Sequence, residues 1–322
     1  MNEWIKVFAP ATVANVGPGF DILGFAVGEP GDVIAARKSQ TVGVSLANIH
    51  YARKGDVGRL PGGIRNTAVI AAMNVLRTLQ QRGFVEKTAG VELALYKNMP
   101  LGSGLGSSGA SAVAAAWAVN VLFGQPLAKH DPDIILACIQ AEASSSGFHA
   151  DNVAPAMLGG VVLIRSYEPL DIIPLDAPQE MVCVIVLPEY EVSTRKARAV
   201  LPEQVALKEV VIPHYANVAG VVAGILKKDL ALFGRSIDDR IVEPARAHLI
   251  PGFYAVKEAA LKSGALGCSI SGAGPSVFAI TDDLERGREI GQAMAQSFAE
   301  HGIAESHIYV SSVNREGVKR IE

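Results

Sequence analysis

The sequence predicts a mixed α+β protein of two domains, and three observations support this fold class. The chain has 322 residues, which exceeds the size of one ordinary domain. Segments with the two-residue period of a strand alternate along it with segments of helical period. Three prolines between residues 166 and 180 interrupt this pattern, as expected of a linker. We therefore expect one domain over residues 1–166 and a second over residues 167–322.

The helices are predicted from their ends and their apolar period. Asn66 is a favoured N-cap and Gly83 a favoured C-terminal residue, so the segment between them is expected to be helical. Asp131 followed by Pro132 opens another helix, because proline fits the first helical position. The expected helices are residues 66–82, 131–143, 214–226, 251–262 and 284–300.

The strands are predicted from short apolar or alternating runs. Only a few residues, Ser39 and Gln40 among them, separate the runs 32–38 and 42–48, which are expected to pair with each other. The other expected strands are residues 4–8, 91–96, 161–164, 181–187 and 307–313.

The charge balance favours small-molecule partners. Lys and Arg number 29 against 32 Asp and Glu, a formal net charge of −3, so the chain lacks a basic footprint for nucleic acid or for an anionic membrane. The first residues do not resemble a secretion leader, and no uninterrupted apolar run approaches the ~18 residues of a membrane span. We expect a cytoplasmic protein. Three isolated cysteines, with no metal-like spacing, are expected to be buried free thiols: Cys138, Cys183 and Cys268.

The stretch from Lys97 to Phe123, KNMPLGSGLGSSGASAVAAAWAVNVLF, carries the clearest sign of function. A glycine-rich segment leads directly into a run of helical period, so unpaired backbone N–H groups are exposed where the helix begins. Glycine allows a phosphate to approach the main chain closely. Serine hydroxyls can add hydrogen bonds or a ligand to Mg²⁺. The alternative is a tight turn before a buried helix.

Several kinds of phosphate loop are excluded by what the segment lacks. A Walker loop requires a lysine after its glycines, and none follows here. Gly104, Gly106 and Gly109 satisfy the dinucleotide spacing, but the preceding strand ends well before them. Asp131 also does not stand at the end of a second strand, where that fold holds its ribose-binding acid. A protein kinase would require H-R-D and D-F-G downstream, and neither occurs.

The segment PLGSGLGSSGAS, residues 100–111, resembles the ATP-phosphate loop of the GHMP small-molecule kinases, with Gly109 in place of the usual alanine. In that family an acidic residue joins a loop serine in holding Mg²⁺, which implies Ser108 and Glu142. The stretch from Glu142 to His149 is one residue shorter than is usual in the homoserine kinase branch. The resemblance implies that ATP contacts Asn66, Lys97, Pro100, Leu101, Gly102, Ser103, Gly104, Leu105, Gly106, Ser107, Ser108, Gly109 and Ala110.

Two further motifs are similar to those of the homoserine kinase branch. The first is APATVANVGPGFD, residues 9–21, whose Asn15 and Asp21 are implied substrate contacts. On composition alone, a glycine-rich hairpin with turn-capping side chains is the alternative. The second is HADNVAPAMLGG, residues 149–160. It implies that Asn152 touches the substrate hydroxyl region and that His149 and Asp151 shape the site, although a lone histidine is more often a buried structural group.

Two arginines complete the resemblance. Thr194 to Arg198 matches the family pattern T-x-x-A-R, which implies Arg198 as a carboxylate ligand and Thr194 near the reacting hydroxyl. Arg246 matches the second carboxylate ligand. Two guanidinium groups can clamp one carboxylate through paired hydrogen bonds. From charge alone, Arg198 would lie on an ordinary basic surface helix. The segment CSISGAGPSVFAI, residues 268–280, resembles the third GHMP motif, although a hairpin turn also explains its glycines.

Together the motifs imply the GHMP kinase fold: an N-terminal α/β domain that carries the phosphate-binding loop and a C-terminal ferredoxin-like α/β sandwich. They imply transfer of the γ-phosphate of ATP, with Mg²⁺, to the side-chain hydroxyl of L-homoserine, a step toward threonine. The implied catalytic residues are Asn152, Thr194 and Asp151, without an identified general base. A mevalonate- or shikimate-type GHMP kinase and a non-catalytic ATP-binding relative remain alternatives, and a homodimer is the family expectation.

Overall fold

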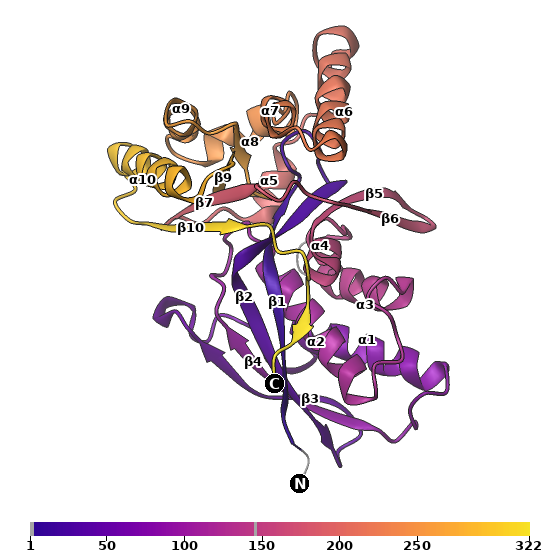
Figure 1. Ribbon diagram of the computed structural model, residues 1–322. Helices are drawn as coiled ribbons and strands as arrows, with labels where there is room; N and C mark the ends of the chain where they lie inside the picture. Colours follow the sequence, from indigo (N-terminus) through magenta and orange to yellow (C-terminus); the bar gives the residue numbers. More distant parts are fainter. Residues whose placement is uncertain (1–2, 145–146) are drawn as a thin grey trace.

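The computed structural model describes residues 3–144 and 147–322 and contains two sheets, each covered by helices (Figure 1). One sheet has seven strands and the other has four. The last strand of the chain returns to the first sheet, so both termini lie at the same end of the molecule (Figure 1). The mixed α+β class expected from the sequence is confirmed.

The larger sheet is built on two long strands, β1 and β2, which pair antiparallel. Its main path runs in the order β11, β1, β2, β4, β3, and the β5–β6 hairpin pairs with the beginning of β2. This hairpin extends the larger sheet to Leu175, and the division into domains at residue 166 stays a prediction. The strand bounds are β1 Ile5–Ala14, β2 Leu23–Ser39, β3 Gly43–Tyr51, β4 Gly90–Lys97, β5 Val161–Tyr167, β6 Leu170–Leu175 and β11 Lys319–Arg320.

The expected pairing of residues 32–38 with residues 42–48 is wrong. Strand β4 lies between β2 and β3, antiparallel to β2 and parallel to β3. The reason is burial: Val91, Leu93 and Leu95 of β4 are fully buried, whereas no residue of β3 is buried. The more apolar strand therefore takes the interior position and leaves β3 at the edge.

Four helices pack beside the larger sheet: α1 Thr67–Gln81, α2 Ser107–Leu122, α3 Pro132–Ala143 and α4 Val153–Leu158 (Figure 1). The Asn66 side chain accepts a hydrogen bond from the backbone N–H of Ala68 at 3.0 Å, and Asp131 accepts from Asp133 at 3.0 Å. Both predicted N-caps are confirmed. Helix α2 is buried along most of its length, which fixes its N-terminus against the sheet.

The smaller sheet has the order β10, β7, β9, β8, with helices α9 and α10 packed on it (Figure 1). Single-turn 3-10 helices η1 Lys54–Asp56, η2 Gly63–Arg65 and η4 Ala247–Leu249 connect larger elements. The remaining bounds are β7 Val182–Pro188, α5 Thr194–Ala199, η3 Leu207–Val211, α6 Ile212–Lys227, α7 Leu230–Arg235, α8 Val242–Arg246, α9 Phe253–Lys262, β8 Gly267–Ile270, β9 Val277–Thr281, α10 Leu284–Glu300 and β10 Ser306–Ser312.

The π-helical turn η3 runs into α6, and together they form a continuous helix from Leu207 to Lys227. This helix has 21 residues and a mean hydropathy of 1.4, so by length and composition it could cross a membrane. Lys208, Glu209 and His214 lie within it, and Gly224 packs on α7. Only 22% of its apolar window is buried, so the helix packs on the rest of the protein along one side.

The prediction that the three cysteines are buried free thiols is confirmed. Cys138, Cys183 and Cys268 are buried and free of disulfides. Burial raises the pKa of the Cys268 thiol to about 12, because an apolar environment disfavours the thiolate. These thiols are packing groups.

One apolar core joins the two sheets. Phe25 of β2 and Phe278 of β9 are both fully buried, and their rings meet edge to face with centroids 6.1 Å apart. This contact holds the smaller sheet on the larger one close to the phosphate-binding loop.

Replacing Phe278 with alanine should therefore destabilise the whole protein. We expect Phe278→Ala to lower the free energy of unfolding by about 3–5 kcal/mol, because a large buried ring is lost and a cavity remains. Urea denaturation measures the change. Phe84→Ala is the matched control, since Phe84 is 53% exposed and its loss should cost little. Equal effects of the two substitutions would contradict the assigned role of this contact.

Candidate active site

A cavity of about 240 Å³ lies where the predicted phosphate-binding loop, residues 100–106, meets the N-terminal segment of the chain and the part of the protein that holds the smaller sheet. Its wall is formed by the N-terminal loop at Asn15 to Asp21, by the segment before α1, by the start of α2, and by residues 149–152. The smaller-sheet side contributes α5, Arg246 of α8 and the glycine turn at residues 272–274. Segments far apart in sequence therefore converge on one site.

The phosphate-binding loop is held from two sides. On one side, the backbone N–H of Thr12 donates to the carbonyl of Leu105 at 3.1 Å. On the other, the Ser271 hydroxyl donates to the carbonyl of Gly104 at 2.8 Å. Gly106 is the N-cap of α2 with φ of 66°, a left-handed conformation that glycine adopts without strain. The first backbone N–H groups of a 16-residue helix consequently open onto the cavity.

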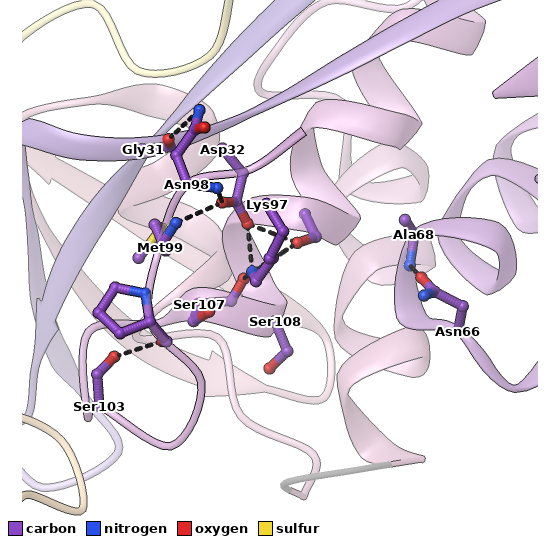
Figure 2. Close-up of polar contacts among 12 residues, drawn as sticks. Gly31, Asp32, Asn66, Ala68, Lys97, Asn98, Met99, Ser103, Ser107 and Ser108 are labelled. Carbon is purple, nitrogen blue, oxygen red and sulfur yellow. Dashed lines mark hydrogen bonds and ion pairs between the residues drawn. The ribbon is translucent and has the colours of Figure 1, made fainter. Parts of the chain in front are cut away.

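The predicted nucleotide residues outside the loop also lie at this end. Asn66 is buried, accepts from Ala68, and donates its amide to the carbonyl of Pro61 at 2.9 Å. Lys97 is buried beneath the loop and forms an ion pair with Asp32 (Figure 2). The loop hydroxyl of Ser103 donates to the carbonyl of Pro100 at 3.0 Å, so it braces the loop from within (Figure 2).

The two residues predicted to hold Mg²⁺ are in contact. The Ser108 hydroxyl donates to the Glu142 carboxylate at 2.8 Å, and both residues line the cavity. Hydroxyl and carboxylate oxygens suit this hard cation, which typically takes one or two carboxylates and completes its shell with substrate phosphates and water. Within residues 3–144 and 147–322 there is no cluster of three or more His, Cys, Asp or Glu residues suited to a metal. Residues 145 and 146, in the shortened stretch after Glu142, lie outside the described part of the chain.

At the other end of the cavity, Arg198 forms a bidentate pair with Asp21. Its two terminal nitrogens donate to the two carboxylate oxygens at 3.1 and 2.9 Å. Arg246 lies nearby, and both guanidinium groups stack on Phe20, at 5.4 and 5.1 Å from the ring centroid. Two guanidinium groups thus lie against one aromatic ring, and the Asp21 carboxylate pairs with one of them.

Arg246 is fixed by the backbone. It is 3% exposed, its Nε donates to the carbonyl of Ala197 at 2.9 Å, and a terminal nitrogen donates to the carbonyl of Gly272 at 2.9 Å. Burial, and next the charge of Arg198, lower the pKa of Arg246 to about 10. The guanidinium therefore stays charged at neutral pH while its position is set in advance.

Two motif residues are held by hydrogen bonds to the protein. The Asn15 amide donates to the carbonyl of Gly272 at 2.9 Å, and its oxygen accepts from the backbone N–H of Asp21 at 3.1 Å. The Asn152 oxygen accepts from the Thr12 hydroxyl at 2.7 Å. These bonds orient the N-terminal motif and the 149–160 motif toward each other.

His149 and Asp151 form a buried pair, with Nδ1 of the ring 3.1 Å from a carboxylate oxygen. Burial acts to lower the pKa of His149, but the hydrogen bond and charge of Asp151, with smaller effects of Asp21 and Glu142, outweigh it and raise that pKa. Tyr167 lies beside this pair. Its hydroxyl donates to the carbonyl of Asp21 at 2.7 Å and accepts from the N–H of Ala150 at 3.0 Å, so it joins the two motifs.

Most of the predicted site residues line the cavity, including Thr194 at the start of α5. Four loop residues do not line it, and all four are buried: Pro100, Leu105, Gly109 and Ala110. The roles of all these residues stay predictions. The sequence did not indicate several residues that bear on the site: Thr12, Phe20, Asp32, Arg65, Ser111, Tyr167 and Ser271. Thr12 and Phe20 lie inside a quoted motif, which was the available signal.

The His149–Asp151 pair should make stability depend on pH. Because the folded-state pKa of His149 is raised, the pair stabilises the fold fully below the unfolded histidine value of about 6.5, and this contribution is lost as pH rises through the folded value. We expect Asp151→Asn to lower the pKa of His149, measured by NMR titration. The Asp151→Asn variant should lose more unfolding free energy, relative to the wild-type protein, at about pH 6 than at about pH 9. In a His149→Gln background the pH dependence should vanish, and its persistence there would assign it to another group.

Alanine substitutions at two glycines of the loop distinguish the cost of backbone strain from the cost of steric crowding. Gly102 and Gly106 have φ of 64° and 66°, but a Cβ at Gly102 meets nothing within 4 Å, whereas at Gly106 it lies 2.2 Å from the Thr12 hydroxyl and 2.6 Å from the Asn152 oxygen. We expect Gly102→Ala to cost about 1–2 kcal/mol of unfolding free energy through backbone strain. Gly106→Ala should cost about 1–3 kcal/mol more, from crowding. Equal losses in urea denaturation would contradict the close packing at Gly106.

The chain is similar to known small-molecule kinases along both of its sheets. Residues 66–160 match the family model of the GHMP kinases N terminal domain, and residues 221–300 match that of the GHMP kinases C terminal. The chain is 44% identical over 312 residues to a homoserine kinase of Chloroherpeton thalassium, covering 96% of this chain and 97% of the relative. It is 43% identical over 323 residues to a homoserine kinase of Arabidopsis thaliana, covering 98% and 84%.

Among solved structures, the crystal structure of homoserine kinase from Cytophaga hutchinsonii superposes with a TM-score of 0.91 at 49% identity. The match covers 100% of this chain and 98% of that one. Sequence identity of this extent over nearly the whole chain establishes the relationship. The chain belongs to the homoserine kinases of the GHMP kinase family.

Proposed function

We propose that this chain transfers the γ-phosphate of ATP to the side-chain hydroxyl of L-homoserine and releases O-phospho-L-homoserine and ADP. The observation that carries the proposal is the pairing of Arg198 with Asp21 beside Arg246, in the same cavity as the amide-rich start of α2. An anion site and an ion pair suited to an amino acid thus face one another. The relatives named homoserine kinase support the same reaction.

The nucleotide end binds phosphate mainly through the backbone. The first N–H groups of α2 and the glycine-rich loop before it provide donors, and the helix dipole adds positive potential at the same point. We place the adenine beside Asn66, at the start of α1, because this segment and the loop border one cavity. Ser107 and Ser108 lie in the first turn of α2, where their hydroxyls can reach phosphate oxygens.

We assign Ser108 and Glu142 as the protein ligands of Mg²⁺, on the ground of their 2.8 Å contact at the cavity wall. When bound there, the ion would neutralise negative charge on the phosphates of ATP. Glu142 is almost completely buried, so its carboxylate would stay in place whether or not a cation is present.

The acceptor end suits a zwitterion. We propose that the homoserine carboxylate pairs with Arg198 and Arg246, while its ammonium group pairs with Asp21. Binding would then exchange one ion pair within the protein for pairs on both sides of the ligand, without leaving a charge uncompensated. Mevalonate and shikimate carry a carboxylate but no ammonium, so they would leave Asp21 without its new partner.

The transfer itself depends on position and charge more than on covalent chemistry. Asn152 accepts from Thr12, so its NH₂ group is the donor that we expect to meet the reacting hydroxyl region. Thr194 lines the same part of the cavity, and Asp151 holds His149. Because Asp151 is committed to this pair, we propose transfer without a dedicated carboxylate base. We also propose that the enzyme is cytoplasmic, and the homodimer stays a prediction.

An acceptor panel tests the proposal. With ATP and Mg²⁺, we expect phosphate transfer to L-homoserine and not to mevalonate, shikimate or galactose. Arg198→Gln should raise the homoserine KM by about 10–100-fold, the equivalent of about 1.5–3 kcal/mol for a charged hydrogen bond. Arg195→Gln, on the exposed side of the same helix, is the matched control and should change KM less than about twofold.

Two results would reject the proposal in different ways. Turnover with another acceptor would support the assigned phosphate site but would contradict the assignment of Arg198 and Arg246 as ligands of the homoserine carboxylate. ATP binding without turnover of any acceptor would indicate a non-catalytic relative.

A further inference from the structure

A buried ion pair lies beneath the phosphate-binding loop and is not used by the proposed reaction. Asp32 stands on β2 and Lys97 at the end of β4, and their side chains are 0% and 1% exposed. Charges at such depth are costly unless each has several partners. The partners of this pair all belong to the two segments that flank the loop (Figure 2).

The Asp32 carboxylate connects the entry of the loop to the helix that follows it. One of its oxygens accepts from the backbone N–H groups of Asn98 and Met99, each at 3.0 Å, where β4 ends. The other accepts from the Ser111 hydroxyl at 2.6 Å, on the second turn of α2, and from Lys97. A single side chain thus holds both ends of the loop at a fixed separation (Figure 2).

The ammonium group of Lys97 is fully engaged. It donates to Asp32, to the backbone carbonyl of Ser107 at 2.7 Å and to the Ser111 hydroxyl at 2.9 Å. A lysine has three N–H donors, so these contacts use all of them. In this arrangement Lys97 has no donor for a phosphate, although it lies directly below the residues that would bind one.

An apolar pair of similar size could fill this space at equal or better stability. It could not accept the N–H groups of Asn98 and Met99 or bind the carbonyl at the start of α2. The retained charges therefore provide a defined geometry for the backbone, which is what an amide-based phosphate site requires.

We infer that Asp32 and Lys97 are positioning residues for ATP, which act by holding the phosphate-binding loop in its binding shape and not by contact with the nucleotide. This inference rests on the proposed function for the identity of the ligand. It assigns Lys97 an indirect role in place of the direct contact that the family resemblance implied.

The direction in which Asp32→Asn changes ATP affinity distinguishes a positioning role from direct contact with the nucleotide. Asp32→Asn removes a negative charge near the phosphates and frees Lys97, so a purely electrostatic or direct role predicts tighter ATP binding. A positioning role predicts weaker binding, because the link between loop and helix is broken. We expect the Kd of ATP, measured by calorimetry with Mg²⁺ and without acceptor, to rise by about tenfold, the equivalent of about 1.4 kcal/mol.

Ser111→Ala tests the same link without changing charge, and it keeps the inference testable if Asp32→Asn does not fold. We expect the Kd of ATP to rise by about fivefold, the equivalent of one net hydrogen bond of about 1 kcal/mol. The control is Asn120→Ala, at the far end of α2. Asn120 is fully buried and bonds Leu127 in both directions, at 2.8 and 3.1 Å, so its loss should destabilise the same helix and leave ATP affinity unchanged.

Steady-state kinetics gives a second readout. In Ser111→Ala the KM for ATP should rise while the KM for homoserine changes less than about twofold, since the acceptor groups lie elsewhere in the cavity. Unchanged or tighter ATP binding in folded Asp32→Asn, or an equal loss of affinity in Asn120→Ala, would overturn the inference. Absence of ATP binding by the wild-type protein would instead reject the proposed function.

Discussion

The proposed phosphate site depends on one constraint: a loop that binds phosphate through unpaired backbone N–H groups must be kept open by bonds made elsewhere. Its donors cannot be satisfied within the loop without closing the site. The protein meets this requirement from outside, through Thr12 on one side, Ser271 on the other, and the buried Asp32 carboxylate below. These three supports come from different parts of the chain, so the loop takes its binding shape only when both sheets are in place.

The same interlocking explains why the acceptor groups converge. Gly272 accepts a hydrogen bond from Asn15 and another from Arg246, while its neighbour Ser271 holds the phosphate-binding loop. The turn at residues 271–274 therefore fixes the relative positions of the N-terminal motif, Arg246 and the phosphate-binding loop. In the proposed complex, this shared turn would set the separation between the nucleotide and the acceptor. Reaction by in-line transfer is sensitive to that separation.

Local features of the fold were predictable from sequence, and long-range ones were not. The caps at Asn66 and Asp131 follow from side-chain chemistry within a few residues, and both are confirmed. The pairing of β3 was predicted wrongly, because neighbours in sequence are the default partners, whereas the more buried β4 takes the place between β2 and β3. Asp32 was read as part of a strand, since nothing within its own segment indicates that its partners lie about 65 residues onward.

The motifs predicted which residues form the cavity wall but not the hydrogen bonds among them. Arg198 and Arg246 illustrate the difference. In sequence they are equivalent carboxylate ligands. In the structure, Arg246 is buried and fixed by two backbone carbonyls, whereas Arg198 is about one-third exposed and holds Asp21. Arg246 can meet a carboxylate without rearrangement, but Arg198 must first release or share its partner. In the proposed binding mode, only a ligand with both charges compensates that exchange fully, so the proposal attributes selectivity for an amino acid to the Arg198–Asp21 pair and basal anion affinity to Arg246.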